Sequence, residues 1–474
     1  MIQHNTKIVI TVGPSCNSYE VLRDLALLGV SVFRLNFSHG SHSDHESVIN
    51  HIVSINEHYG LHLGILADLQ GPKLRIGSIE NNALHVNEGD ILTFKDEECL
   101  GNNDQIYMSY DRFAQDVKIG ERILIDDGKL VFEVVESNGK DTVKLKALYG
   151  GILSSNKGVN LPDTVISLPS LTDKDLVDLQ FILTQPVNWI ALSFVRKAED
   201  IVNLIQLIDK AGHHAKVIAK IEKPEALKNL DEIIKVSNAI MIARGDLGVE
   251  MPIEKLPTIQ KMIIRKCIQR SRPVIVATQL MDSMINNPSP TRAEVTDVAN
   301  AVLDGCDAVM LSAETSVGKH PILVVEAMNK IIVEAEHHYS FHNNRPKLSE
   351  KSSTFLSDVV CFNAAKVAEE LNAKAIIGLT VSGYTAFKTS SFRTNCPIFI
   401  FSSSREILGT LNLVWGVRAY FYNKMISTDE TIEDITRILK EDHKIQKGDL
   451  IVNTGSMPIH AKLRTNMLKV TEVE

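Results

Sequence analysis

The sequence predicts an α/β protein built on a parallel (β/α)8, or TIM, barrel, with a small antiparallel β-barrel domain inserted as a lid and an α/β domain at its C-terminal end. Two observations indicate the central barrel. Eight short apolar, β-branched runs recur along the chain, and helical patterns lie between many of them. Polar or charged residues gather at the C-terminal end of nearly every run, where such barrels carry their active sites.

The eight runs are expected to be the barrel strands, because near-continuous apolarity is typical of strands buried on both faces. In chain order they are 7–13, 31–37, 63–69, 188–194, 215–222, 238–246, 272–279 and 307–314. The helical patterns between them include 18–28, 199–211, 256–269 and 321–338.

The pattern changes over residues 73–168, where apolar and polar residues alternate and turn dipeptides occur. Asp-Gly at 127–128 and Asn-Gly at 138–139 are strong hairpin signals. We therefore predict an antiparallel β domain inserted after the third barrel strand, which divides the barrel into 1–72 and 169–338. An insertion at that point lies above the catalytic face, so we expect a lid that excludes water.

A second α/β pattern follows the barrel. Residues 339–353 are polar and aperiodic, which predicts a linker to a separate domain over 354–474. In that domain we expect a helix at 356–370 followed by strands at 375–380, 397–402, 416–422 and 449–455, with a further helix that opens at the segment 380–385.

Composition narrows the class of protein. The 474 residues carry 50 Lys and Arg against 58 Asp and Glu, a formal net charge of −8, so no overall basic field attracts nucleic acid or an anionic membrane. Six cysteines without C-x-x-C spacing argue against a zinc site and a disulfide framework, and favour a reducing compartment. With no leader pattern and no run of 18 apolar residues, we expect a cytoplasmic protein.

Charged residues of both signs fall at or near the predicted strand ends. The cations are Arg34, Arg75 and Lys220, and the anions are Asp68, Glu222 and Asp246. Any one of them is as compatible with a helix cap or a structural ion pair. Because all barrel strand ends converge on one face, the six together indicate a shared site, and two neighbouring carboxylates suit Mg²⁺.

Lys220 lies inside a predicted buried strand, where an unpaired charge is costly. We interpret it as an electrophile that stabilises negative charge on a transferred group, with a structural ion pair to Glu222 or Asp246 as the alternative. The glycines of 241–248 follow the next strand, so backbone N–H groups there can bind an oxyanion at a helix start.

These residues carry a resemblance to the pyruvate kinase family over essentially the whole chain. The matching motifs, in order, are RLNFSHG (34–40), GPKLRIG (71–77), NKGVNLP (156–162), AKVIAKIEKPEAL (215–227), MIARGDLG (241–248), ATQLMDSM (277–284), PTRAEVTDVANAVLDG (290–305) and LSAET (311–315). The resemblance implies a glycolytic phosphotransferase that moves the phosphoryl group of phosphoenolpyruvate to ADP, giving pyruvate and ATP. It also implies a mobile lid, a regulatory C-terminal domain and a homotetramer.

The resemblance assigns roles to the strand-end residues. Glu222 and Asp246 would bind Mg²⁺ or Mn²⁺, and Arg34 and Lys220 would hold the phosphoryl group during transfer. The substrate carboxylate would lie against the backbone N–H groups of Ala243, Arg244 and Gly245, beside Asp246.

A second set of matched residues concerns protonation and the nucleotide. Thr278 would lie near the carbon that becomes the methyl group, with Ser312 and Glu314 as a polar relay behind it. The nucleotide-binding positions would be Pro14, Asn36, His39, Arg75 and Lys157. Without the resemblance, Lys157 would be interpreted as a solvated surface lysine.

One departure from the common family pattern concerns potassium. Many members have D-T-K-G-P-E at the third strand, whereas this chain has D-L-Q-G-P-K, ending at Lys73. The positions matching the family's potassium site are Asn36, Ser38, Asp68 and Leu69. The Lys73 ammonium can replace the mobile ion, so the sequence resembles the potassium-independent branch and K⁺ is not expected to be required.

Regulation is expected from the segment Thr380, Ser382, Gly383 and Thr385, which resembles the family's effector phosphate loop. An ordinary helix-capping turn is the alternative. The later loop at 457–466 lacks the Trp and Arg pattern associated with fructose 1,6-bisphosphate, which favours a sugar monophosphate or AMP as the allosteric activator.

Two other functions stay open at this point. The first is a Mg²⁺-dependent 2-oxo acid aldolase or lyase in a similar barrel, which would not need the lid or Lys157. The second is a sugar-phosphate sensor that has lost its chemistry, although every matched catalytic position is present.

Overall fold

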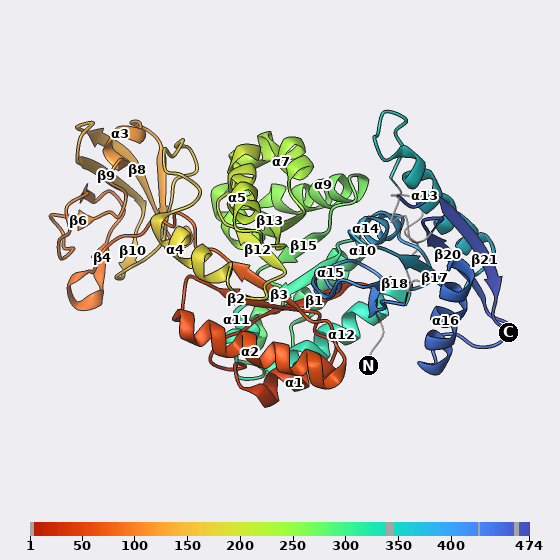
Figure 1. Cartoon of the computed structure of the whole chain (residues 1–474). Coiled ribbons are helices and arrows are strands. Elements are labelled where there is room, and N and C mark those ends of the chain that lie inside the picture. Colours follow the sequence, from red (N-terminus) through yellow and green to blue (C-terminus); the bar gives the residue numbers. More distant parts are fainter. Residues whose placement is uncertain (1–3, 338–345, 425–426, 459–463) are drawn as a thin grey trace.

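The computed structural model describes residues 4–337, 346–424, 427–458 and 464–474. Its three parts lie in a row, with the central barrel flanked by the inserted β domain on one side and the C-terminal domain on the other (Figure 1). The predicted linker at 339–353 and the predicted end of the preceding helix fall partly on 338–345, outside the described residues.

Eight parallel strands form a closed barrel in the order β1-β16-β15-β14-β13-β12-β3-β2. Their bounds are β1 Lys7–Thr11, β2 Val32–Asn36, β3 Gly64–Asp68, β12 Trp189–Leu192, β13 Lys216–Ile221, β14 Ala239–Ala243, β15 Val274–Ala277 and β16 Ala308–Leu311. Each strand lies within a predicted run, which confirms the (β/α)8 fold. The predicted runs are longer because their polar ends belong to the loops at the barrel mouth.

Helices surround this barrel, and several begin at reciprocal caps. They are α1 Tyr19–Leu27, α2 His42–Tyr59, α4 Asp173–Ile182, α5 Ala198–Lys210, α6 Pro224–Lys228, α7 Leu230–Val236, α8 Arg244–Glu250, α9 Leu256–Gln269, α10 Arg292–Leu303, α11 Ala313–Ser316 and α12 Pro321–His337, with 3-10 turns η2 Ile253–Lys255 and η3 Asp282–Ile285. Ser41, Thr172 and Thr291 each accept a hydrogen bond from the backbone of an acidic residue three positions later, whose side chain bonds back to the cap.

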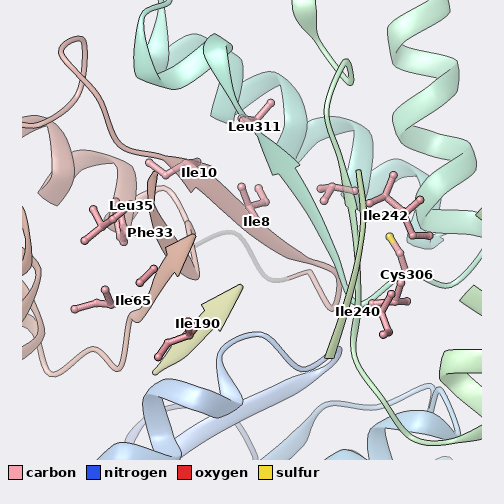
Figure 2. Packing of buried hydrophobic residues seen from close by; sticks show 14 of the residues in the cluster. Ile8, Ile10, Phe33, Leu35, Ile65, Ile190, Ile240, Ile242, Cys306 and Leu311 are labelled. Carbon is pink, nitrogen blue, oxygen red and sulfur yellow. The ribbon is translucent and has the colours of Figure 1, made fainter. Parts of the chain in front are cut away.

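The twofold period of the strands divides the barrel core into two layers. Ile8 and Ile10 of β1 and Phe33 and Leu35 of β2 belong to the large buried cluster that joins the strands to the helices (Figure 2). Residues that alternate with them along the strands, such as Val9 and Val32, belong to a second cluster inside the barrel. Truncating one of these fully buried side chains to alanine is expected to cost about 2–5 kcal/mol.

The inserted domain confirms both hairpin predictions. Its strands are β4 Leu84–Val86, β5 Ile91–Lys95, β6 Ile106–Tyr107, β7 Arg122–Ile125, β8 Leu130–Ser137, β9 Thr142–Tyr149, β10 Gly151–Leu153 and β11 Val159–Asn160, with η1 Glu80–Asn82 and α3 Phe113–Asp116. The turns at 127–128 and 138–139 join β7 to β8 and β8 to β9. Six strands form one sheet in the order β11-β7-β8-β9-β5-β6, in which β5 and β6 pair in parallel. Isolated bridges from Arg75 to Gly158 and from Ile76 to Met108 connect residues 75 and 76 to segments next to the two edge strands, β11 and β6.

The C-terminal domain is a five-stranded sheet with helices, in the strand order β19-β18-β17-β20-β21. Its elements are α13 Phe355–Glu370, β17 Ala375–Leu379, α14 Tyr384–Ser391, β18 Ile398–Ser402, α15 Arg405–Leu411, β19 Val417–Phe421, α16 Thr428–Glu441, β20 Leu450–Gly455 and β21 Met467–Glu472. The antiparallel edge strand β21 was not predicted, because its sequence MLKVTE is short and half polar. None of the described helices is long and apolar enough to cross a membrane.

Candidate active site

The alternation inside the barrel brings charged side chains to its C-terminal mouth. Leu66 and Ile218 belong to the inner apolar cluster, and Asp68 and Lys220 lie two positions further along the same strands. Because side chains two residues apart lie on the same face of a strand, Asp68 and Lys220 also face the interior. Glu222 continues this series just beyond the end of β13.

These side chains form one ion-pair network. Lys220 Nζ lies 3.0 Å from Glu222 Oε1 and 3.3 Å from Asp68 Oδ1. Asp68 Oδ2 accepts a hydrogen bond of 2.7 Å from Nε of Arg34. The carboxylate of Asp68 therefore links the two cations that the family resemblance assigns to the phosphoryl group.

Burial and neighbouring charge set the protonation of this network. Burial acts to lower the pKa of Lys220, but Asp68 and Glu222 outweigh it and the pKa of the ammonium is raised. Burial acts to raise the pKa of Asp68, but Lys220 and Arg34 hold it below its usual value. Burial raises the pKa of Glu222, with Asp246 acting in the same direction.

Two hydroxyl residues at this site were not predicted. Lys220 Nζ donates to Ser193 Oγ at 2.7 Å, and Ser193 Oγ donates to the carbonyl of Leu69 at 2.8 Å. Arg34 Nη1 donates to Thr11 Oγ1 at 2.8 Å. The signal for Ser193 was present in the sequence, because it lies two and four residues after the inward-facing Ala191 and Trp189.

Glu222 and Asp246 fit a small divalent cation. Glu222 is 1% exposed, and its Oε2 accepts a 2.7 Å hydrogen bond from the backbone N–H of Phe194. Asp246 lies on the first turn of α8, close enough to raise the pKa of Glu222. In the described part of the chain no group of three or more His, Cys, Asp or Glu side chains forms a metal cluster. Two carboxylates suit Mg²⁺, which completes its shell with water and substrate oxygens.

The residues predicted for protonation lie at the ends of β15 and β16. Thr278 Oγ1 accepts a 2.7 Å hydrogen bond from the backbone N–H of Gly245, so the 243–246 segment contacts Thr278 directly. Glu314 is 1% exposed and accepts from the N–H groups of Ser312 at 2.7 Å and Met281 at 3.2 Å. Burial raises the pKa of Glu314. The buried Ser312 Oγ has no hydrogen-bond partner.

The predicted nucleotide positions belong to two parts of the structure. Pro14 and His39 are exposed in loops after β1 and β2, and Asn36 Oδ1 accepts from the backbone N–H of Ser38 at 3.2 Å. Arg75 and Lys157 lie on the inserted domain, where Arg75 Nη1 donates to the carbonyl of Asn156 at 2.9 Å.

Two lysines of the inserted segment have acidic partners. Lys157 Nζ lies 2.9 Å from Asp126 Oδ1, so its ion pair is formed within the inserted domain. Lys73 Nζ lies 3.9 Å from Asp246 Oδ1, and both side chains are about one-third exposed, at 37% and 30%. Lys73 therefore lies beside a predicted metal ligand, at the boundary between the insert and the barrel. Of the predicted potassium positions, Leu69 is buried and contributes its carbonyl to Ser193.

The predicted effector residues form a tight turn before α14. Gly383 has φ +83°, and its N–H donates to Thr380 Oγ1 at 2.9 Å. Ser382 is exposed, whereas Thr385 is 3% exposed and bonds Thr465 Oγ1 at 2.6 Å. In the later loop, residues 459–463 lie outside the described residues.

The fold and the mouth define a class: a (β/α)8-barrel enzyme whose buried cations and paired carboxylates suit an anionic substrate with a divalent ion. Two family profiles match the chain, "Pyruvate kinase, barrel domain" over residues 3–325 and "Pyruvate kinase, alpha/beta domain" over 358–471. The chain belongs to the pyruvate kinase family, and it is a phosphotransferase.

Full-length relatives agree. The chain is 43% identical over 479 residues to pyruvate kinase 2 of Synechocystis, covering 100% of this chain and 80% of that protein. It is 40% identical over 467 residues to pyruvate kinase of Mycobacterium tuberculosis, covering 98% of each. A crystal structure of a pyruvate kinase from Cryptosporidium parvum superposes with a TM-score of 0.93 at 34% identity, covering 99% of this chain and 96% of the other.

Proposed function

We propose that this enzyme transfers the phosphoryl group of phosphoenolpyruvate to ADP, giving pyruvate and ATP. The observation that carries the proposal is the position of Lys220, whose Nζ lies at the barrel mouth within 3.3 Å of Asp68 and Glu222. A permanently charged ammonium, held by fixed partners, stabilises a group that carries negative charge without reorganising during the reaction. Family membership over both barrel and C-terminal domain leaves no observation that favours an aldolase or a lapsed sensor.

Arg34 and Lys220 hold the phosphoryl group from two sides. Asp68 accepts a hydrogen bond from Nε of Arg34, and Thr11 accepts one from Nη1. The remaining N–H groups of the guanidinium can bind the ligand. Because phosphoryl transfer spreads charge over three equatorial oxygens, the residues act mainly by positioning and by charge neutralisation. Mg²⁺ or Mn²⁺ on Glu222 and Asp246 would add Lewis-acid stabilisation of the substrate oxygens.

Protonation of the enolate follows transfer. Thr278 is assigned to deliver the proton at the carbon that becomes the methyl group, with Ser312 and Glu314 supporting it. The raised pKa of Glu314 is consistent with a carboxyl group that exchanges protons. The substrate carboxylate is assigned to the backbone of Ala243, Arg244 and Gly245.

The nucleotide is assigned to Pro14, Asn36, His39, Arg75 and Lys157. Lys157 must leave Asp126 to reach a nucleotide phosphate, so its 2.9 Å ion pair represents a resting arrangement within a lid formed by residues 73–168. Nucleotide binding would be linked to lid closure, because Lys157 would exchange the Asp126 carboxylate for a nucleotide phosphate.

Potassium is assigned no essential role. The Lys73 ammonium, 3.9 Å from Asp246, is the charge that we propose in place of the potassium ion, whose family ligands match Asn36, Ser38, Asp68 and Leu69. A phosphorylated metabolite, a sugar monophosphate or AMP, is proposed as activator at Thr380, Ser382, Gly383 and Thr385. A cytoplasmic homotetramer is proposed from the family.

The experiment is an assay of pyruvate formation from phosphoenolpyruvate and ADP with Mg²⁺, in buffer free of Na⁺ and K⁺. We expect full activity there, and a further increase with a sugar monophosphate or AMP. Absence of pyruvate formation under all conditions would reject the activity. A strong rise on adding K⁺ would reject only the role of Lys73, and no response to phosphate esters would reject only the effector site.

A further inference from the structure

The turn that carries Thr278 has an unusual backbone. Thr278 and Gln279, directly after β15, have φ of +69° and +52°. The left-handed region is disfavoured for residues with a Cβ, and most of all for a β-branched residue such as threonine. Two consecutive residues in this conformation persist only where surrounding contacts hold them.

The side chain of Arg244 supplies such contacts. Its Nη2 donates to the carbonyl of Thr278 at 2.8 Å and to the carbonyl of Gln279 at 3.2 Å. These are the carbonyls of the two left-handed residues. The Arg244 side chain is 9% exposed, so little water competes for these hydrogen bonds.

Asp297 of α10 fixes the guanidinium itself. Arg244 Nη1 donates to Asp297 Oδ1 at 2.8 Å, and Nη2 lies 2.8 Å from Asp297 Oδ2. This bidentate arrangement sets the plane of the guanidinium as well as its position. Nη1 also donates to Gln260 Oε1 at 3.4 Å.

Gly245, the residue after Arg244, contacts the side-chain hydroxyl of Thr278. The backbone N–H of Gly245 donates to Thr278 Oγ1 at 2.7 Å, and Oγ1 donates to the carbonyl of Ala277 at 2.6 Å. Residues 244 and 245 therefore fix both the backbone of Thr278 and the position of its hydroxyl.

We propose that Arg244 is a positioning residue for proton transfer, acting through Thr278 with Asp297 as its partner. This inference rests on the proposed role of Thr278. In that step a C3–H bond forms from the C2=C3 electron pair of the pyruvate enolate, and the C2–O⁻ bond becomes the carbonyl. The proton arrives through the Thr278 hydroxyl, which is then reprotonated from solvent.

The test separates proton transfer from substrate binding. Exchange of the pyruvate methyl protons for deuterium in D₂O, with Mg²⁺ and ATP, measures the proton step by NMR, and calorimetry measures phosphoenolpyruvate binding. The variants are Thr278→Ala, Arg244→Lys, Asp297→Asn and the double variant Thr278→Ala with Arg244→Lys. Arg272→Lys is the matched control, because Arg272 also donates to a backbone carbonyl, that of Lys235, but lies before the other end of β15.

We expect Thr278→Ala to slow exchange about 100-fold, within the range typical of general acid–base groups. Arg244→Lys and Asp297→Asn should each slow exchange about 10-fold or more, because small displacements of a reacting group are costly. Phosphoenolpyruvate affinity should change less than about threefold, and the double variant should exchange no more slowly than Thr278→Ala. Arg272→Lys should match the wild type.

Three results would overturn the inference: unchanged exchange in Asp297→Asn and Arg244→Lys, a double variant much slower than Thr278→Ala, or a large loss of phosphoenolpyruvate binding in Arg244→Lys. Unchanged exchange in Thr278→Ala would instead reject the proposed role of the threonine. If Arg244→Lys does not fold, Asp297→Asn decides, because it keeps the size of the side chain and removes only its charge.

Discussion

The barrel has a largely buried lysine near each end, and the two lysines have different partners. Lys220, at the C-terminal mouth, lies between two carboxylates and a serine hydroxyl. Lys7, at the start of β1, is 7% exposed and donates to the carbonyl of Val417 in the C-terminal domain at 2.6 Å. Carboxylates raise the pKa of Lys220, whereas burial, with Arg418, lowers the pKa of Lys7 to about 7.

This difference distinguishes a lysine whose charge can stabilise an anion from a lysine that contributes to the packing of two domains. A lysine with a raised pKa keeps its charge and can stabilise an anion, provided that its partners admit one. A lysine with a backbone carbonyl as partner and a lowered pKa contributes a hydrogen bond to a domain contact. Burial alone therefore does not identify a catalytic lysine, but its partners do.

The largest expected effect is on turnover at the mouth. Lys220→Met should lower kcat about 1,000-fold or more, because it removes the cation that we propose stabilises the transferred group. Lys7→Met is the matched control, a buried lysine in the same barrel, and should leave kcat near that of the wild type. Pyruvate formation measures both, and comparable losses in the two variants would contradict the distinction.

The next effect concerns the requirement for K⁺. Lys73→Glu should lower the rate in K⁺-free buffer about 100-fold, since a fixed positive charge beside Asp246 is replaced by a negative one. Added K⁺ should restore most of the rate. Lys140→Glu, a charge reversal on an exposed lysine in the turn between β8 and β9 of the insert, controls for the change in net charge. A rate that stays low after K⁺ is added would argue against the proposal that Lys73 replaces the potassium ion.

A smaller loss is expected for the serine that holds Lys220. Ser193→Ala removes one of the three short contacts of the Lys220 ammonium. Because the ammonium is then less well oriented, kcat should fall about 10-fold. Ser193→Thr should recover part of the rate by restoring the hydroxyl. An unchanged rate in Ser193→Ala would show that the two carboxylates position Lys220 by themselves.

The smallest effect is on the pH dependence of stability. Lys7 has a pKa near 7 in the folded protein and 10.5 when unfolded, so the unfolded chain binds the additional proton between these values. The free energy of unfolding therefore rises with pH across this window, and Lys7→Met should flatten the slope by up to about 1.4 kcal/mol per pH unit. Denaturant unfolding between about pH 7.5 and 9.5 measures the slope, and equal slopes would contradict the lowered pKa.

The sequence was sufficient for the barrel and for the main charges at its mouth. Strand runs and their polar ends predicted β13 and placed Lys220 and Glu222 near its C-terminal end, at the mouth of the barrel. Ser193 was missed although its register was visible, because serine at a strand end is common. The Arg244 contacts were beyond reach, since they join residues 34 and 53 positions apart through a turn whose left-handed φ values no local pattern indicated.

Strand β16 connects the two ends compared above. Asp307, directly before it, accepts from Arg393 Nη2 at 2.9 Å and from the N–H of Trp415 at 3.2 Å, both in the C-terminal domain. Ser312 directly follows its four residues, which span about 13 Å at the usual rise of roughly 3.3 Å per residue. The C-terminal domain therefore contacts one end of β16, and Ser312, which we propose supports proton transfer, lies at the other end. If the C-terminal domain moves on binding an effector, only these four residues separate that movement from Ser312.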